Sequence, residues 1–133
     1  MGNSSYRRSD MRLTKNFTLQ EFASKDGAPF PHEVVKNLSV LAKQLQIIRD
    51  EIGHPISITS GYRSPAHNAK IKGAKHSYHV KGMAADIKVK VMQPKEVKDV
   101  ILKLMQEGKI IKGGLKAYAT WVHYDFRGQI VLF

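Results

Sequence analysis

The chain has 133 residues, a length that fits one domain with a buried core. It contains no cysteine, which excludes disulfides, cysteine nucleophiles and thiolate metal ligands, so any metal site must be built from His, Asp and Glu. Its formal net charge of +11 favours an anionic partner such as nucleic acid, acidic membrane or cell wall, but the lysines are scattered and do not choose among these.

The N-terminal region is polar and basic. Residues 1–13 predict a flexible basic arm, and residues 14–133 predict the folded domain. The first 16 residues lack the apolar middle segment of a secretory signal, and no apolar run in the sequence is long enough to cross a bilayer. We therefore expect a cytoplasmic protein that another factor releases.

Helical patterns dominate the next part of the chain. Thr18 and Glu21 have capping-box spacing, which predicts a short helix over residues 19–23. A long helix is predicted between Pro31, which suits a first turn, and Gly53, which suits the position just past the end. Its apolar residues recur at steps of four and three, namely Val34, Leu38, Leu41, Leu45, Ile48 and Ile52. We expect this stripe to belong to the core.

Strand patterns begin after Gly53. Residues 56–60 alternate apolar and polar, which predicts a strand with one buried face. Ser64 as a cap and Pro65 at the first helical position predict a short helix that ends near Ile71. Residues 84–91 predict a second strand. Its buried face would carry Ala85, Ile87, Val89 and Val91, and its other face Asp86, Lys88 and Lys90.

The last third predicts one helix and three strands. The helix starts at Pro94, carries Val97, Ile101 and Leu104 on one face, and closes at Gly108. The strands are expected over residues 115–118, 121–126 and 130–133. This order of elements predicts an α+β fold, a single compact domain with a mainly antiparallel sheet packed against helices.

One constellation of residues carries recognisable chemistry. Residues 77–86 read S-x-H-x-x-G-x-A-x-D, and residues 121–125 read W-V-H-Y-D. They supply two imidazoles, His79 and His123, and one carboxylate, Asp86, the ligand count of a catalytic zinc site with an open fourth position. On a strand, Trp121, His123 and Asp125 would share a face, because side chains alternate.

These residues resemble those of peptidase family M15, the zinc D-Ala-D-Ala carboxypeptidases and related phage endolysins. Further matches to its small phage and gut-bacterial members are residues 60–65 (SGYRSP), 67–69 (HNA) and 113–114 (GG), so that the resemblance spans residues 13–128. It implies that His79, Asp86 and His123 bind one zinc ion and that Arg63 lies over the substrate. It also implies the compact α+β fold shared with the signalling domain of hedgehog proteins.

The chain departs from the family at the general base. Many members place an acidic residue three positions before the last histidine ligand, or a histidine two positions before it. Here those positions hold Thr120 and Trp121, and neither accepts a proton usefully. Asp125 is the nearest carboxylate by sequence, and we predict it as the base, with the alternative that it orients a ligand histidine.

The expected mechanism uses zinc to lower the pKa of its water to about 7. Asp125 would take the proton and pass it to the leaving amine, while zinc and Arg63 stabilise the oxyanion. Ser77 would hydrogen-bond the substrate or hold the His79 loop.

Several neighbouring residues have alternative roles. Tyr62 and Tyr78 would line the groove or pack, and Trp121 would stack against substrate or form the pocket wall. The alternative role of Arg63 is structural, as the partner of an acidic neighbour in an ion pair. His67 and His76 flank the site in sequence, and a structural or solvent-exposed role is the more common one for such residues.

The sequence therefore predicts a zinc peptidase that cleaves the stem or cross-bridge peptide of bacterial peptidoglycan. It is expected to be a monomer without a specific nucleic-acid partner, and the missing signal suits a phage or prophage endolysin. Two alternatives stay open: a zinc-containing cell-wall-binding module with weak or no catalysis, and a basic nucleic-acid-binding domain. The sequence does not distinguish a carboxypeptidase from an endopeptidase.

Overall fold

The computed structural model describes residues 11–133. Its elements are η1 (Leu19–Phe22), α2 (His32–Ile52), β1 (Ser57–Ser60), α3 (Pro65–Lys70), β2 (Ala84–Lys88), α4 (Pro94–Gln106), β3 (Gly114–Ala117), β4 (Val122–Asp125) and β5 (Val131–Leu132). The strands form one sheet in the order β1-β2-β4-β3-β5. Every pairing is antiparallel except that of β3 with β5. The predicted α+β class with a mainly antiparallel sheet is confirmed.

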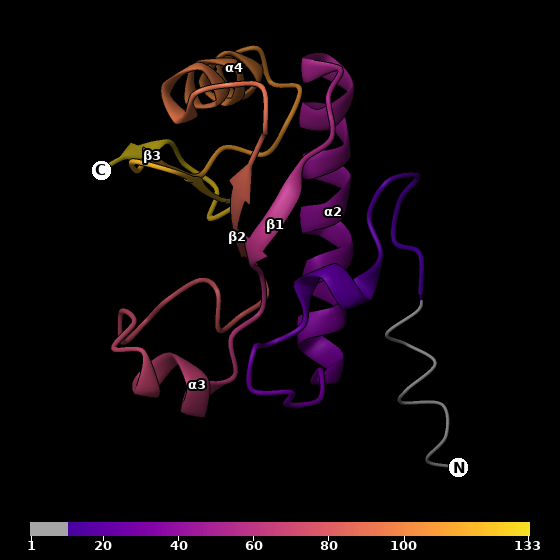
Figure 1. Ribbon diagram of the computed structural model, residues 1–133, viewed down its shortest axis with the longest axis vertical. Helices are drawn as coiled ribbons and strands as arrows, with labels where there is room; N and C mark the ends of the chain where they lie inside the picture. Colours follow the sequence, from indigo (N-terminus) through magenta and orange to yellow (C-terminus); the bar gives the residue numbers. More distant parts are fainter. Residues whose placement is uncertain (1–10) are drawn as a thin grey trace.

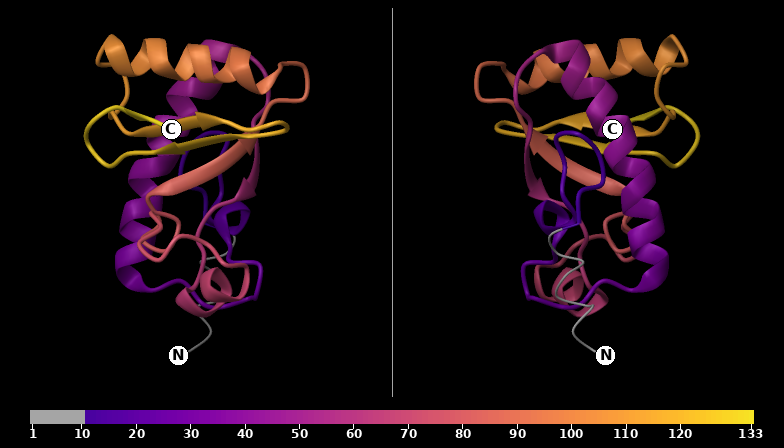
Figure 2. Two further views of the ribbon diagram at one scale, coloured as in Figure 1. Left: turned by 90° about the vertical axis from the view of Figure 1, so that its left-hand side faces the viewer. Right: turned by 90° about the vertical axis from the view of Figure 1, so that its right-hand side faces the viewer.

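Helices α2 and α4 pack on one face of the sheet. Figure 1 shows α2 running beside β1 and β2, with α4 across one end of the molecule and α3 at the other. Figure 2 shows the same arrangement from two sides. The core contains the predicted α2 stripe, in which Leu38, Leu41, Leu45 and Ile48 are fully buried. The opposite sheet face is thereby left for polar side chains.

The predicted helix ends agree closely with the structure. The Glu21 carboxylate accepts a hydrogen bond from the Thr18 N–H at 2.7 Å, as the capping box predicts, although the helix is a single 3-10 turn. Gly53 has φ 77° and donates its N–H to the Arg49 carbonyl, which ends α2. Ser64 caps α3 by accepting from the His67 N–H at 3.1 Å. Pro31 differs slightly, because it lies at the N-cap of α2 and not in its first turn.

The predicted strand over residues 84–91 is wrong at its C-terminal end. Strand β2 stops at Lys88, and Val91, which we expected on the buried face, is 64% exposed. The Met92 N–H donates to the Val89 carbonyl, so the chain turns here toward α4. Alternation in the sequence continues past the point where the pairing ends.

The predicted arm, residues 1–13, lies for its first ten residues outside the described part of the chain. The last three residues pair with the segment that follows. The Leu19 N–H donates to the Met11 carbonyl at 2.8 Å, and Arg12 bridges to Thr18. Leu13 packs against the core. Residues 11–13 therefore belong to the folded unit.

Candidate metal centre

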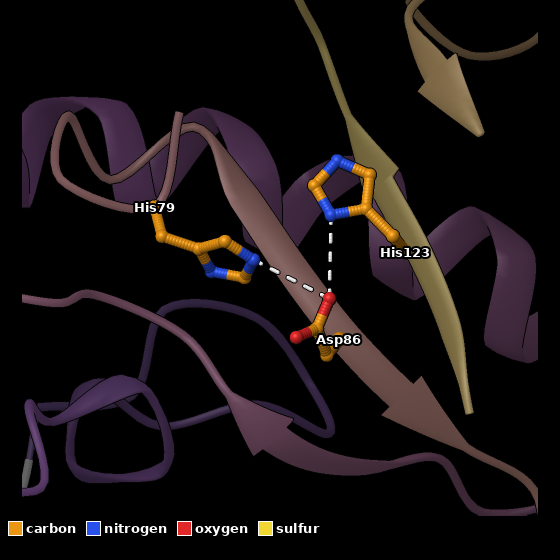
Figure 3. A group of neighbouring side chains, drawn as sticks. All are labelled: His79, Asp86 and His123. Atoms are coloured by element: carbon orange, nitrogen blue, oxygen red, sulfur yellow. Dashed lines mark hydrogen bonds and ion pairs between the residues drawn. The ribbon is translucent and has the colours of Figure 1, made fainter. Parts of the chain in front are cut away.

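Three elements bring the two histidines and the aspartate together. His79 lies in the loop between α3 and β2, Asp86 lies on β2, and His123 lies on β4 directly opposite Asp86 in the β2–β4 register. One ligand atom from each of the three lies within 4.8 Å of the other two. Figure 3 shows both imidazoles directed at the same carboxylate oxygen. The sheet pairing thus joins residues that are 37 positions apart in the chain.

The His79 ring is fixed by its surroundings. Its Nδ1 lies 2.8 Å from the Gly61 carbonyl oxygen, which only accepts, so Nδ1–H donates to it and Nε2 is the nitrogen directed at the ligand trio. That Nε2 lies 3.3 Å from Asp86 Oδ1. The Ser77 hydroxyl accepts the His79 backbone N–H at 3.1 Å and holds the loop. Gly82 turns the chain at φ 76°, where a Cβ would contact Val34 at 2.9 Å.

The His123 ring faces Asp86 with its Nδ1, whereas the His79 ring faces Asp86 with its Nε2. Its Nδ1 lies 3.3 Å from Asp86 Oδ1, and its Nε2 donates to Asp125 Oδ2 at 2.8 Å. Burial lowers the pKa of His123, but hydrogen bonds to Asp125 and Asp86 outweigh burial, so the pKa is raised overall. A metal ion here would replace a proton on Nδ1, with Nε2–H still bonded to Asp125.

Asp86 divides its two oxygens between different partners. Oδ1 faces both imidazoles, and Oδ2 accepts from the Arg63 guanidinium at 3.3 Å. Burial raises the pKa of this carboxyl, but the bonds to His123 and His79 outweigh it and hold the pKa well below its usual range. Two neutral imidazole nitrogens and one ionised carboxylate oxygen at one point are the donor set of an open zinc site, and the residues fit the ion.

Asp125 is completely buried, with 0% exposure, and all its bonds are internal. Besides His123, it accepts from the Gly114 N–H at 2.9 Å and from two guanidinium nitrogens of Arg127 at 2.7 and 2.8 Å. Burial raises its pKa, but the bonds from Arg127 and His123 outweigh burial and hold the pKa well below its usual range. Arg127 was missed by sequence reasoning; its position two residues after Asp125 was the available signal.

The ligand trio opens on a cavity of about 400 Å³, here called the metal cavity. Of the predicted site residues, Arg63, Ser77 and Trp121 line it together with the trio. His76, Tyr78 and Arg127 also line it, and among the residues that line it Asp86 is the only carboxylate. The Arg63 side chain is 16% exposed, so it reaches the cavity while it pairs with Asp86.

Two predicted site residues do not line the cavity, the buried Asp125 and Tyr62. Tyr62 packs in the core. It is 3% exposed, and its ring packs 5.9 Å from Phe30. Burial raises the pKa of its hydroxyl. A substrate contact for Tyr62 is therefore corrected to a packing role, the alternative that its apolar surroundings favour. His67 likewise does not appear among the lining residues of the metal cavity.

Comparison with known protein families gives a match over most of the chain. The family model described as Peptidase M15 matches residues 12–125, which is most of the chain and includes all three metal-ligand candidates. No curated protein matches the chain. The chain belongs to peptidase family M15, a family of zinc-dependent metallopeptidases.

Proposed function

We propose that this protein is a zinc-dependent peptidase that hydrolyses the stem or cross-bridge peptide of bacterial peptidoglycan, as a D,D-carboxypeptidase or an endopeptidase. The observation that supports it most is the convergence of His79, Asp86 and His123 on one point of an open cavity. Family membership supports the reaction class. Peptidoglycan as the substrate rests on the resemblance to D-Ala-D-Ala peptidases and endolysins.

The three residues would hold one zinc ion through His79 Nε2, an Asp86 oxygen and His123 Nδ1. Zinc, when bound, supplies a Lewis acid that polarises a peptide carbonyl and lowers the pKa of water to about 7. Arg63 points a guanidinium into the same cavity, where it would stabilise the negative charge that develops on the carbonyl oxygen. Its bond to Asp86 fixes the guanidinium in place before the substrate arrives.

We assign Asp125 the role of orienting His123, the second of its two predicted roles. Its full burial and its two bonds from Arg127 leave neither oxygen directed at the cavity. Proton transfer then falls to another residue of the wall. His76 lines the metal cavity, is exposed, and is the one imidazole there outside the ligand trio, and imidazole is the side chain that most often transfers protons in catalysis.

The test is mass spectrometry of fragments released from defined muropeptides. Zinc-loaded wild type is expected to release peptide fragments, chelated protein to release none, and added zinc to restore release. His79→Ala is expected to be inactive, while His54→Ala, which removes an exposed histidine away from the site, retains activity. Equal release by His79→Ala would reject the proposal.

A second candidate is a zinc-containing cell-wall-binding module without catalysis. It is favoured by two observations: residues 11–133 place no free carboxylate in the metal-cavity wall, and Thr120 and Trp121 stand at the positions where many family members place a base. One zinc per chain, binding to purified peptidoglycan and no released fragment would select this candidate.

We further propose that the protein is a monomer that stays cytoplasmic until released, as a phage or prophage endolysin would. Among residues 11–133, no helix combines the length and apolar character that a bilayer span requires.

The nucleic-acid alternative predicts a gel shift that weakens steeply with salt. We expect no sequence-specific shift, because the site chemistry is that of a peptidase.

A further inference from the structure

A second cavity of about 520 Å³ adjoins the metal cavity. We call it the lysine cavity, because Lys88 and Lys90 line it. The turn after β2, the start of α4 and the β3–β4 loop form its other walls. Trp121 lines both cavities and therefore forms the partition between them.

The partition is a fixed aromatic surface. The Trp121 ring stacks on the Tyr118 ring with centroids 4.4 Å apart and an interplanar angle of 9°. The Tyr118 N–H also donates to the Trp121 carbonyl at 2.8 Å, which closes the loop. A ligand that spans both cavities would cross the edge of this stacked pair.

Strand geometry sets the distance between the two cavities. Asp86 and Lys88 lie two residues apart on β2 and therefore share a sheet face, and Trp121 lies two residues before His123, directly ahead of β4. Two residues of strand span about 7 Å. An extended peptide with its cleaved bond at the metal site would therefore reach Lys88 within about two or three residues.

Most of the charged side chains that line the two cavities are positive. Lys88 and Lys90 line the lysine cavity, and Arg63 and Arg127 line the metal cavity. Within residues 11–133, Asp86 is the only carboxylate that lines either cavity. Neither lysine forms an ion pair with any of residues 11–133. The floor between the lysines is apolar, with Ile87, Val89 and Val97. This wall suits a ligand with a carboxylate on an otherwise apolar segment.

We infer that the lysine cavity is a second substrate subsite, which binds an acidic residue two or three positions from the peptide bond cleaved at the metal centre. The inference rests on the proposed peptidase function and narrows its substrate class to an acidic peptide. Lys88 and Lys90 pair with the substrate carboxylate, and Trp121 packs against the residue between the subsite and the cleaved bond.

The experiment compares two synthetic peptides that differ only in having Glu or Gln three residues from the cleaved bond. For wild type, kcat/KM is expected to be roughly five-fold or more higher for the Glu peptide, through KM, and added salt should reduce this preference. The double variant Lys88→Gln/Lys90→Gln should lose the preference, so that its kcat/KM becomes equal for the two peptides. The matched control Lys36→Gln/Lys43→Gln makes the same change in net charge at exposed positions of α2 and should keep the preference.

A binding measurement separates failure of the subsite from failure of the peptidase. Trp121 is the only tryptophan, so its fluorescence reports occupancy of the partition directly. In the cleavage-deficient His79→Ala background, the Glu peptide is expected to change this fluorescence at lower concentration than the Gln peptide, and the Lys88/Lys90 variant should remove the difference. Equal affinity for both peptides would overturn the inference, as would equal competition by an oligonucleotide of matched charge. Absence of cleavage with this binding difference intact would overturn only the peptidase proposal.

Discussion

His123 lies between two carboxylates, and its role depends on both. Asp86 faces Nδ1 and Asp125 faces Nε2, so Asp125 fixes both the tautomer and the ring orientation of a ligand histidine. Arg127 holds Asp125 in turn through three hydrogen bonds, two from its guanidinium and one from its backbone N–H. Asp125 and Arg127, which are not ligands, thus hold the ligand His123 in position.

Asp125→Asn is expected to weaken zinc binding by about 10- to 100-fold without abolishing it, because an amide orients the ring less firmly and lacks the negative charge. Competition against a chromophoric chelator measures the Kd. Asp99→Asn, an exposed carboxylate of α4, is the matched control and should leave the Kd unchanged. Unchanged affinity in Asp125→Asn would contradict the orienting role, and loss of activity with unchanged affinity would return Asp125 to the role of base.

His76→Gln is expected to lower kcat by about 100-fold or more, within the range of general-base contributions, while zinc content stays at the wild-type level. Steady-state kinetics on a defined muropeptide measure kcat, and metal analysis of the same samples measures the zinc content. His54→Gln serves as the control. Wild-type kcat in the His76 variant would remove this residue from the mechanism.

The sequence predicted the identity of the three ligand candidates, because residue type and spacing carry that information. It could not predict which nitrogen each histidine presents, since the Gly61 carbonyl and Asp125 decide this through tertiary contacts. Tyr62 shows the converse error. Its place beside Arg63 in the motif indicated the groove, but the strand-to-helix connection turns its ring into the core.

At the scale of elements, α2 is the main packing surface. Leu41 is fully buried on its core face, whereas Ile47 is an exposed apolar residue of the same helix. Leu41→Ala should lower the free energy of unfolding by about 2–5 kcal/mol, through lost transfer energy and a cavity. Ile47→Ala should change it by less than about 0.5 kcal/mol. Urea titration measures both, and equal losses would contradict the assigned helix face.

The loop at residues 24–28 is tied to the start of α3 by one carboxylate. Asp26 Oδ2 accepts from the Ser64 hydroxyl at 2.6 Å, and Oδ1 accepts from the Ala28 N–H at 3.1 Å. Hydrogen bonds with the Ser64 side chain, which contributes most, the Ser24 side chain and the Ala28 N–H lower the pKa of Asp26 from 3.8 to about 2. Because the folded pKa lies below the unfolded one, the ionised form stabilises the fold above pH 4, and this contribution is lost as the pH falls toward 2.

The free energy of unfolding of wild type should exceed that of Asp26→Asn by a constant amount from pH 7 to about 4.5, and the difference should shrink from pH 4 to 3. Urea titrations of both proteins at each pH give this difference, in which the titration of other groups cancels. A difference that stays constant down to pH 3 would show that Asp26 does not keep its bonds in solution.

Element types were predictable because apolar period and capping residues are local signals. The end of β2 was not predictable, because a strand ends where its partner strands end. The apolar–polar alternation of the sequence runs on to Val91 and does not indicate where that pairing stops. The parallel pairing of β3 with β5 also depends on the path of the chain between them. Local pattern therefore predicted which segments form strands, and tertiary pairing set their limits.

At the scale of the whole molecule, the sheet divides packing from chemistry. Along β2, Ala85 and Ile87 are buried in the core, whereas Asp86 lines the metal cavity and Lys88 lines the lysine cavity, whose floor Ile87 also forms. The fold class was predictable because this alternation requires helices on one side only. That the loop between α3 and β2 meets β2 and β4 at one point was not predictable from the sequence, because it depends on how the strands pair in three dimensions.

The zinc content of the purified protein after gel filtration, measured by mass spectrometry of the metal, tests the central claim most directly. We predict one zinc per chain for wild type and His54→Ala, and less than a tenth of that for His79→Ala and His123→Ala. Folded wild-type protein without zinc, or equal zinc in all four proteins, would contradict a metal centre at His79, Asp86 and His123.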